Sequence, residues 1–391
     1  MPQPARAPVR HFLRTRHGRA FVYQALALGA LVAAGWLLWH NTADNLAARQ
    51  IRSGFGFLAQ PSGFDIGEAL FAYSSRDSYL RAFAVGVANT LRVALAGIVL
   101  ATVLGTLIGI GRLAQNALLR GLCTAYVEVL RNVPLIIQLF AWYLVLTELL
   151  PAATEPLRLG THFFLSKSGL QFPFPEWSTG WSVALAGVPI GILAAIGYRH
   201  WARQRRLRTG VAPPAVWPAL LLALGMPVLG WLVGGAPTDF DVPAVGSFDV
   251  TGGAAATPEF LSLLIGLTGF TAAYIAENVR SGVLAVPGGQ TEAAAALGLS
   301  RGLTLRLVLL PQALRVIVPP LTSQYLNLTK NSSLAVAIGY PDVVSIANTT
   351  INQNGQALEC VLMIMTVYLA INLMTALLMG WYNRRVAIVE R

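Results

Sequence analysis

Long apolar stretches alternate with short polar segments along the whole chain. A helix needs about 20 mostly apolar residues to cross about 30 Å of hydrocarbon. Eight stretches reach this length, although the third, sixth and seventh each have a charged residue in or near them. The pattern predicts membrane-spanning helices at residues 20–39, 84–111, 128–149, 180–198, 215–233, 260–279, 313–338 and 360–382. We therefore expect an all-α integral membrane protein.

The composition supports this class and excludes several others. Hydrophobic residues make up 55% of the 391 residues and charged residues 12%, whereas an ordinary soluble domain carries about 25% charged residues. This excludes a disordered chain, a typical cytosolic enzyme and a nucleic-acid-binding protein, so no nucleic acid partner is expected. Cys123 and Cys360 lie far apart and the five histidines are scattered, so the sequence contains no metal-ligand cluster.

The distribution of basic residues predicts the orientation. Cytoplasmic loops of membrane proteins carry an excess of Lys and Arg. With eight spans and a cytoplasmic N-terminus, 18 Lys or Arg fall in inside segments and six in outside loops. Residues 1–19 and 383–391 are therefore expected in the cytoplasm, and residues 40–83 on the opposite side of the membrane.

Charged residues within the spans should face protein, water or headgroups, because charge in lipid is costly. Glu128 with Arg131, and Glu277 with Arg280, are spaced i,i+3 on one helix face. A structural ion pair is the preferred role for each, with direct contact to a substrate as the alternative. The other such residues near span ends are expected to extend toward water: Arg92, Glu148, Arg315 and Glu359.

Two glycines four residues apart, Gly105 and Gly109, lie in the second span. Small residues at this spacing allow helices to pack closely in lipid. Glycine is also common in membrane spans, so close packing and simple abundance remain equally compatible with the sequence.

The segment 286–311 has the strongest signal in the chain. Pro287 and the two glycines after it break the preceding helix, and the alanine-rich stretch 290–297 favours a new one. Gly298 can end that helix. Residues 301–310 predict a second short amphipathic helix, with Pro311 at the entry to the next span. This helix pair is too apolar for a free loop and should dock on a partner.

Here the sequence resembles a known family. The pattern of Glu292-Ala293-Ala294, Gly298, Val308 and Leu310-Pro311 resembles the EAA loop of permease subunits of binding-protein-dependent ABC importers. Four further stretches resemble the polar amino acid subfamily: 89–91, 126–138, 273–282 and 328–334.

The resemblance covers residues 84–149 and 260–382, which would form the two parts of the permease core. Within the subfamily, the chain is similar to the large permease subunit of general L-amino acid and glutamate/glutamine/aspartate/asparagine importers. Residues 150–259 look like an insertion with two extra spans.

This resemblance implies a type I ABC importer permease fold with cytoplasmic coupling helices. It also implies a cytoplasmic ABC ATPase dimer, a second and shorter permease subunit, a periplasmic amino-acid-binding protein and a bacterial inner membrane. ATP and Mg would bind to the ATPase subunit, and this chain would bind no cofactor. The residues implied in ATPase coupling are Glu292, Ala293, Ala294, Gly298, Leu310 and Pro311.

The chain itself has no phosphate-binding loop. Such a loop requires Gly-x4-Gly-Lys-Ser/Thr. Lys167 follows Ser166, and Lys330 follows Thr329, so neither lysine fits the pattern. We therefore expect no catalytic residues and no ATPase activity in this chain.

A polar run interrupts the seventh apolar stretch and is a candidate for the substrate pathway, since polar groups at membrane depth usually line a cavity. The alternative is that these residues only cap or hydrogen-bond helices. Related permeases often have Asp where this chain has Asn331, so we expect neutral and acidic substrates rather than cationic ones. The run consists of Lys330, Asn331, Ser332 and Ser333.

Two other classes of membrane protein would show different features in the sequence. A secondary transporter driven by an ion gradient would show inverted repeats and ion sites near mid-membrane. The chain has no convincing repeat, and its acidic residues lie mostly near span ends. A membrane enzyme would need a constellation of His, Cys or carboxylates, and none of adequate spacing is present.

Overall fold

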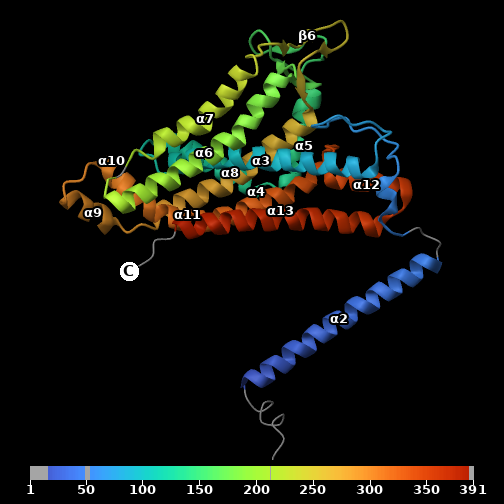
Figure 1. Ribbon diagram of the computed structural model, residues 1–391, viewed down its shortest axis with the longest axis horizontal. Coiled ribbons are helices and arrows are strands. Elements are labelled where there is room, and N and C mark those ends of the chain that lie inside the picture. Colours follow the sequence, from blue (N-terminus) through green and yellow to red (C-terminus); the bar gives the residue numbers. More distant parts are fainter. Residues whose placement is uncertain (1–15, 49–52, 212, 387–391) are drawn as a thin grey trace, which may run out of the picture. The chain divides into compact units, whose positions relative to one another are not determined.

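The computed structural model describes residues 16–48, 53–211 and 213–386 (Figure 1). The described residues form two compact units, the first from those within 1–95 and 282–391 and the second from those within 96–281. Most of the described chain is helical, which confirms the predicted fold class. Short strands, which the sequence analysis did not predict, occur only between residues 157 and 256 of the described chain.

Seven helical stretches among the described residues are long and apolar enough to cross a membrane. They correspond to seven of the eight predicted spans. Their bounds are Arg19–Thr42, Tyr79–Gly111, Thr179–Thr209, Val216–Val233, Pro258–Leu284, Arg301–Ile338 and Ala357–Arg384.

The third predicted span, over residues 128–149, is not one continuous helix. The helix α4 (Ala117–Asn132) ends before Pro134, and a second helix follows, made of α5 (Leu135–Leu144) and the π-helical η2 (Val145–Leu149). The two helices are bent by 106° relative to each other. Proline disfavours helical backbone at the residue before it, and Val133 is extended with φ −96° and ψ 127°. The apolar stretch is therefore divided between two helices, and the count becomes eight spans if the bent pair is one span.

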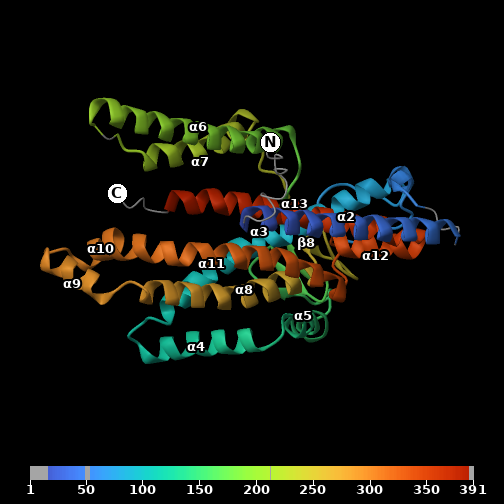
Figure 2. The same cartoon turned by 90° about the horizontal axis from the view of Figure 1, so that it is seen from below.

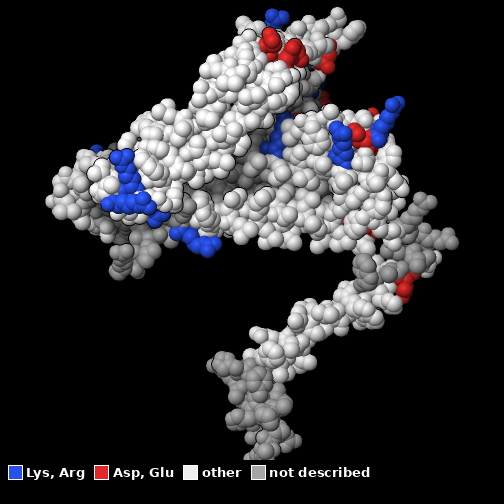
Figure 3. Space-filling view, in the orientation of Figure 1, with Lys and Arg blue, Asp and Glu red and all other residues white. Residues whose placement is uncertain are grey.

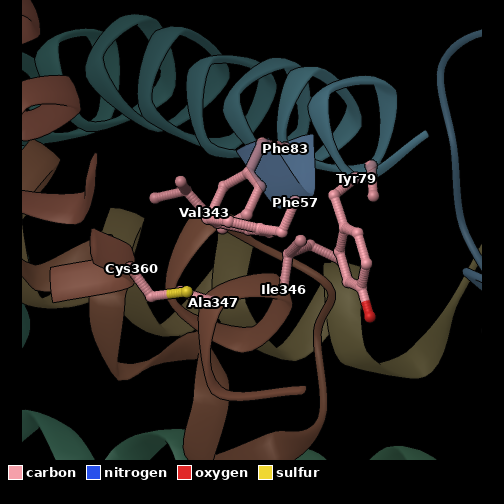
Figure 4. Close-up of a cluster of buried hydrophobic side chains, with 8 residues drawn as sticks. Phe57, Tyr79, Phe83, Val343, Ile346, Ala347 and Cys360 are labelled. Atoms are coloured by element: carbon pink, nitrogen blue, oxygen red, sulfur yellow. The ribbon is translucent and has the colours of Figure 1, made fainter. Parts of the chain in front are cut away.

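In the first unit, a hydrophobic core joins the start of α3 (Tyr79–Gly111) to α12 (Val343–Asn354) and the start of α13 (Ala357–Val386). The 3-10 helix η1 (Phe55–Ala59) contributes Phe57, whose ring meets Tyr79 edge to face at 5.5 Å (Figure 4). The core consists of Phe57, Tyr79, Ala82, Phe83, Val343, Ile346, Ala347 and Cys360. The unit also contains α2 (Arg16–Ala48) and α11 (Leu310–Asn331), and α11 packs on α13.

In the second unit, the segment predicted as an insertion contains a hairpin of α6 (Thr179–Thr209) and α7 (Val216–Val233), which lie side by side in both views (Figures 1 and 2). Glycines bring the two backbones together: a Cβ at Gly187 would lie 2.6 Å from the Met226 carbonyl oxygen, and one at Gly230 would lie 2.7 Å from that of Val183.

Antiparallel strands close one end of this hairpin. One sheet has the order β1 (Leu157–Arg158), β2 (Phe164–Ser166), β3 (Gly169–Phe172) and β8 (Ala254–Ala256). Because β3 and β8 are neighbours, the whole hairpin is inserted between two paired strands. The other pairs are β4 (Phe174–Pro175) with β5 (Phe240–Asp241) and β6 (Ala244–Val245) with β7 (Val250–Thr251).

The second half of α3 packs closely on α8 (Pro258–Leu284). A Cβ at Gly105 would lie 2.7 Å from the Ala272 carbonyl oxygen, and one at Gly109 would lie 2.8 Å from that of Ala276. Such separations are shorter than real Cβ contacts, so these positions require glycine. The structure therefore supports close helix packing as the reason for Gly105 and Gly109, rather than the general abundance of glycine in membrane spans.

We expect Gly105→Ala to destabilise the purified protein by about 1–3 kcal/mol, because an added methyl group overpacks this contact. Gly121→Ala is the matched control: Gly121 lies within α4 and has nothing within 4 Å of the added Cβ. The thermal denaturation midpoint in detergent should fall for the first variant alone. Equal midpoints would show that α3 and α8 can separate without cost.

Candidate functional site

The alanine-rich segment forms a short helix, as the sequence predicted. It is α9 (Gly288–Ala296), which begins after Pro287 and so extends two residues further toward the N-terminus than expected. Ala294 is buried, whereas Glu292 and Ala293 are exposed. The helix therefore anchors through one face and leaves Glu292 free to meet another molecule.

Gly298 ends α9 in a left-handed conformation, with φ +74°. The amide of Leu299 donates to the Ala294 carbonyl at 3.1 Å, and the amide of Gly298 donates to that of Ala295 at 2.9 Å. These bonds satisfy carbonyls that the end of a helix otherwise leaves unpaired. The prediction that Gly298 terminates the first helix is confirmed.

The second helix of the pair is not a separate element, and this corrects the prediction for residues 301–310. The helix α10 (Arg301–Thr304), with Ser300 as its N-cap, continues through the π-helical η3 (Leu305–Leu309) into α11. Pro311 cannot donate a backbone hydrogen bond and would crowd the carbonyl four residues earlier. The wider π-helical turn lies directly before Pro311, so it accommodates this proline and lets the helix continue.

An elbow therefore consists of α9, the Gly298 turn and the start of the long helix. Its two arms are connected by Gln312, whose amide donates to the Gln290 side chain at 3.4 Å. Several large apolar side chains on the elbow are exposed, with Leu297 at 81%. The others are Leu303, Leu305, Leu307 and Leu310. An apolar surface with charged neighbours such as Glu292 and Arg301 is typical of a docking site.

Glu277 lies at the centre of a cluster of charges in the second unit. Its carboxylate accepts a hydrogen bond from Arg280 at 2.6 Å and forms an ion pair with Arg112 as well. The Glu277–Arg280 contact is the structural pair that the i,i+3 spacing predicted. Arg112 is only 9% exposed, and the sequence analysis did not connect it to this pair because it is 165 residues away.

The predicted pair of Glu128 and Arg131 is absent from the ion pairs of the described residues. The Arg131 guanidinium lies over the ring of Tyr274, 5.1 Å from its centroid. A cation over an aromatic face is attracted by the negative ring surface. The i,i+3 spacing allowed an ion pair, but the neighbouring helix α8 supplied a different partner.

The polar run lies where α11 ends and the 3-10 helix η4 (Ser332–Ile338) begins. Ser332 is buried, and its hydroxyl donates to the Thr329 carbonyl at 2.7 Å. Ser333 donates likewise to the Lys330 carbonyl at 2.8 Å. These bonds favour the capping role for the two serines. Lys330 is exposed and Asn331 half-buried, so these two remain candidates for contact with a substrate.

A buried polar cluster, which we call the α12 clamp, connects α12 to the first turns of α3. The Asn89 amide donates to the carbonyls of Glu68 and Pro341 at 2.8 and 2.9 Å. The amide of Val343 donates to the Thr90 hydroxyl at 3.2 Å. The remaining member is Asp342, which caps α12 by accepting the Ser345 amide at 2.8 Å.

The α12 clamp reaches the polar run through one residue, Tyr368 of α13. Its hydroxyl donates to the Asp342 carboxylate at 3.3 Å and lies 3.5 Å from the Ser332 hydroxyl. In the sequence, Asn89 and Thr90 carry a signal only through the resemblance to the polar amino acid subfamily. Asp342 follows a Gly-Tyr-Pro turn after an apolar stretch, and this polar residue at a helix start was the missed signal.

Two charged residues expected to reach water are in fact held by protein. Arg92 forms an ion pair with Glu68, which is 8% exposed. Glu359 is 6% exposed and accepts the Gly54 amide at 2.6 Å. Their partners, Glu68 and Gly54, lie in the segment before α3, which the hydropathy pattern predicts only as a connection between two spans.

Asp342 predicts a pH dependence of stability. Burial raises the pKa of its carboxyl to about 7 from 3.8, against hydrogen bonds from Ser345 and Tyr368 that lower it. The unfolded chain loses this proton near pH 4 and the folded chain only near 7, so folding stability falls as the pH rises between these values. Asp342→Asn cannot ionise and retains an oxygen for the Ser345 amide.

We therefore expect the thermal midpoint of Asp342→Asn to exceed that of the wild type by an amount that grows from about pH 4 to pH 8. Denaturation of the purified chain across this pH series is the measurement. Parallel curves for the two proteins would contradict a raised pKa at this position.

The chain is similar to known proteins over nearly its whole length. Residues 187–388 match the family model described as "binding-protein-dependent transport system inner membrane component". The general L-amino acid transport system permease protein AapQ of Rhizobium johnstonii is 48% identical over 373 residues, which cover 95% of this chain and 93% of that protein.

Two further similarities accompany this match. The glutamate/glutamine/aspartate/asparagine transport system permease protein BztB of Rhodobacter capsulatus is 40% identical over 388 residues, covering 91% of this chain and 90% of that protein. A crystal structure of an amino acid ABC transporter with histidines is 18% identical with a TM-score of 0.46, covering 78% of this chain and 95% of that chain.

Proposed function

Since the chain belongs to the family of binding-protein-dependent transport system inner membrane components, as the permease rather than the ATPase subunit of an ABC importer, we propose that it moves L-amino acids into the cytoplasm. The substrate class includes glutamate, glutamine, aspartate and asparagine. Its support is the similarity to AapQ and BztB over more than 90% of the chain.

The single observation that carries the coupling mechanism is the exposed apolar elbow at Gly298. We place it in a surface groove of the ATPase dimer, with Glu292 in polar contact at its edge. Because the second arm continues without a break into α11, a displacement of the elbow is transmitted along one rigid helix. A flexible connection would absorb the same movement.

The complex would contain this chain, a second permease subunit, two ATPase subunits and a periplasmic amino-acid-binding protein. ATP and Mg would bind to the ATPase subunits alone. The excess of Lys and Arg supports an orientation with both termini in the cytoplasm. In this orientation α4 and α5 together must cross the membrane once. If they did not cross it, every later loop would lie on the opposite side of the membrane.

Within the permease, we assign the substrate pathway to the polar run at the end of α11. Lys330 can attract a substrate carboxylate, and Asn331 can accept or donate a hydrogen bond without adding negative charge. The two serines hold the backbone at the change from α11 to η4.

The test of the proposed function is uptake into proteoliposomes. The chain is reconstituted with the permease, ATPase and binding-protein subunits of the same transport system, and labelled glutamate is supplied outside. We expect accumulation that requires ATP inside and continues without any ion gradient. Accumulation driven by an ion gradient with this chain alone would establish a secondary transporter and contradict the proposal.

The uncharged side chain of Asn331 predicts the substrate preference. In the same proteoliposomes, we expect Asn331→Asp to lower glutamate uptake and to raise the ratio of arginine to glutamate uptake about tenfold, since one unfavourable contact of about 1.4 kcal/mol corresponds to a factor of ten. Asn348→Asp adds the same charge at an exposed position on α12 and serves as the control. An equal change of the ratio in both variants would remove Asn331 from the pathway.

A further inference from the structure

The end of α6 projects past its partner helix. At 1.5 Å per residue, the 31 residues of α6 extend about 46 Å and the 18 residues of α7 about 27 Å. The Tyr198 hydroxyl donates to the Pro214 carbonyl at 3.1 Å, so α7 begins level with Tyr198. From there α6 continues for eleven residues to Thr209, and Figure 2 shows this end extending beyond α7.

Aromatic side chains mark the same level as the membrane interface. Trp201 is 47% exposed and packs against Tyr198 with ring centroids 5.5 Å apart. Trp217, in the first turn of α7, is 74% exposed. Exposed Trp and Tyr gather at the headgroup level of membrane proteins. The projecting end of α6 therefore starts at the headgroups.

This projecting end is strongly basic and lacks acidic neighbours in its own hairpin. Five arginines lie within ten residues, all exposed, and no Asp or Glu occurs between residues 177 and 238. None of the ion pairs among the described residues involves them. The five are Arg199, Arg203, Arg205, Arg206 and Arg208, and Figure 3 shows basic side chains toward this end of the hairpin and acidic ones at the strand-bearing end.

We propose that the end of α6 binds the phosphate groups of anionic phospholipids, with Arg199 and Arg203 in direct contact. The headgroup layer is about 5–8 Å thick on each side of the hydrocarbon. Arg199 and Arg203 follow Tyr198 by one and five residues, which corresponds to about 1.5 and 7.5 Å along the helix. Arg199 and Arg203 are four residues apart and therefore lie on one face of the helix. There, each planar guanidinium group can donate two hydrogen bonds to two oxygens of a phosphate.

The more distant arginines have a different role. Arg205 and Arg208 lie about 10 and 15 Å beyond Tyr198, and the Arg205 guanidinium stacks on Trp201 at 5.2 Å. At this distance salt screens their attraction to the membrane surface, because the Debye length is about 8–10 Å. They offer an equal charge at a greater distance, and this makes them a matched control.

The test measures how much phosphatidylglycerol the full chain retains. The purified chain is placed in nanodiscs of phosphatidylcholine with increasing fractions of phosphatidylglycerol, and the bound lipids are counted by native mass spectrometry. One basic residue near an anionic surface contributes about fivefold in affinity, so Arg199→Gln with Arg203→Gln should weaken binding about 25-fold. Arg205→Gln with Arg208→Gln should weaken it less than about fivefold.

Other outcomes would overturn the proposal. Unchanged lipid retention in both double variants would mean that the arginines act only in orienting the hairpin during insertion. Loss of ATPase co-purification with unchanged lipid retention would assign the surface to a protein partner. Should the first variant fail to insert, Arg199→Lys with Arg203→Lys retains the charge and the orientation. The ammonium group of lysine lacks the two parallel donors of a guanidinium group, so we expect this variant to bind the lipid about tenfold more weakly. Unaltered binding would contradict direct guanidinium contact.

Discussion

Gly298→Val should uncouple transport from ATP hydrolysis. We expect ATP-driven uptake to fall at least about tenfold, whereas the amount of assembled complex and its rate of hydrolysis persist. Gly298 has φ +74°, and a residue with a Cβ in this conformation costs about 1–2 kcal/mol. Valine, which is branched at Cβ, is still less tolerant of it. The Gly298 turn would therefore open and change the angle between α9 and the helix that continues into α11.

The control for this prediction lies four residues further along. Gly302 is in α10, has ordinary helical backbone and, like Gly298, has nothing within 4 Å of an added Cβ. Gly302→Val therefore adds the same side chain to the same elbow without opening the turn, and uptake should remain near that of the wild type. If both variants lose uptake equally, bulk on the docking surface and not the angle of the turn is responsible.

Glu277→Gln should strongly destabilise the protein. Among the described residues, Glu277 is the one carboxylate that pairs with the guanidinium groups of Arg112 and Arg280, and the substitution removes its charge. Arg112 is 9% exposed. Removing one partner of a largely buried ion pair costs on the order of 3 kcal/mol. We expect a lower thermal midpoint in detergent and a lower yield of inserted protein.

Glu148→Gln is the matched control for the loss of charge. Glu148 is 67% exposed and lies 3.8 Å from the Lys167 ammonium group. Exposed pairs of this kind contribute about 0–1 kcal/mol, so its thermal midpoint should hardly change. A midpoint for Glu277→Gln equal to that of Glu148→Gln would show that the charge cluster is solvated in the working protein.

The sequence alone determined the class of the protein and the position of the elbow. Both depend on local properties. Apolar length decides whether a segment can cross the membrane, and seven of the eight predicted spans are found as single helical stretches. The turn at Gly298 depends on one residue that tolerates positive φ, so it was predictable from a single position.

Tertiary structure alone decided the partners of the charged and polar groups. Arg112 joins Glu277 from another helix, Arg131 lies over Tyr274 instead of pairing with Glu128, and Asp342 meets Tyr368 of α13. Spacing along one helix indicates which groups can meet within that helix, but a charge in a folded protein pairs with the best neighbour in space. Because those neighbours come from segments up to 165 residues away, only the packing of the helices could identify them.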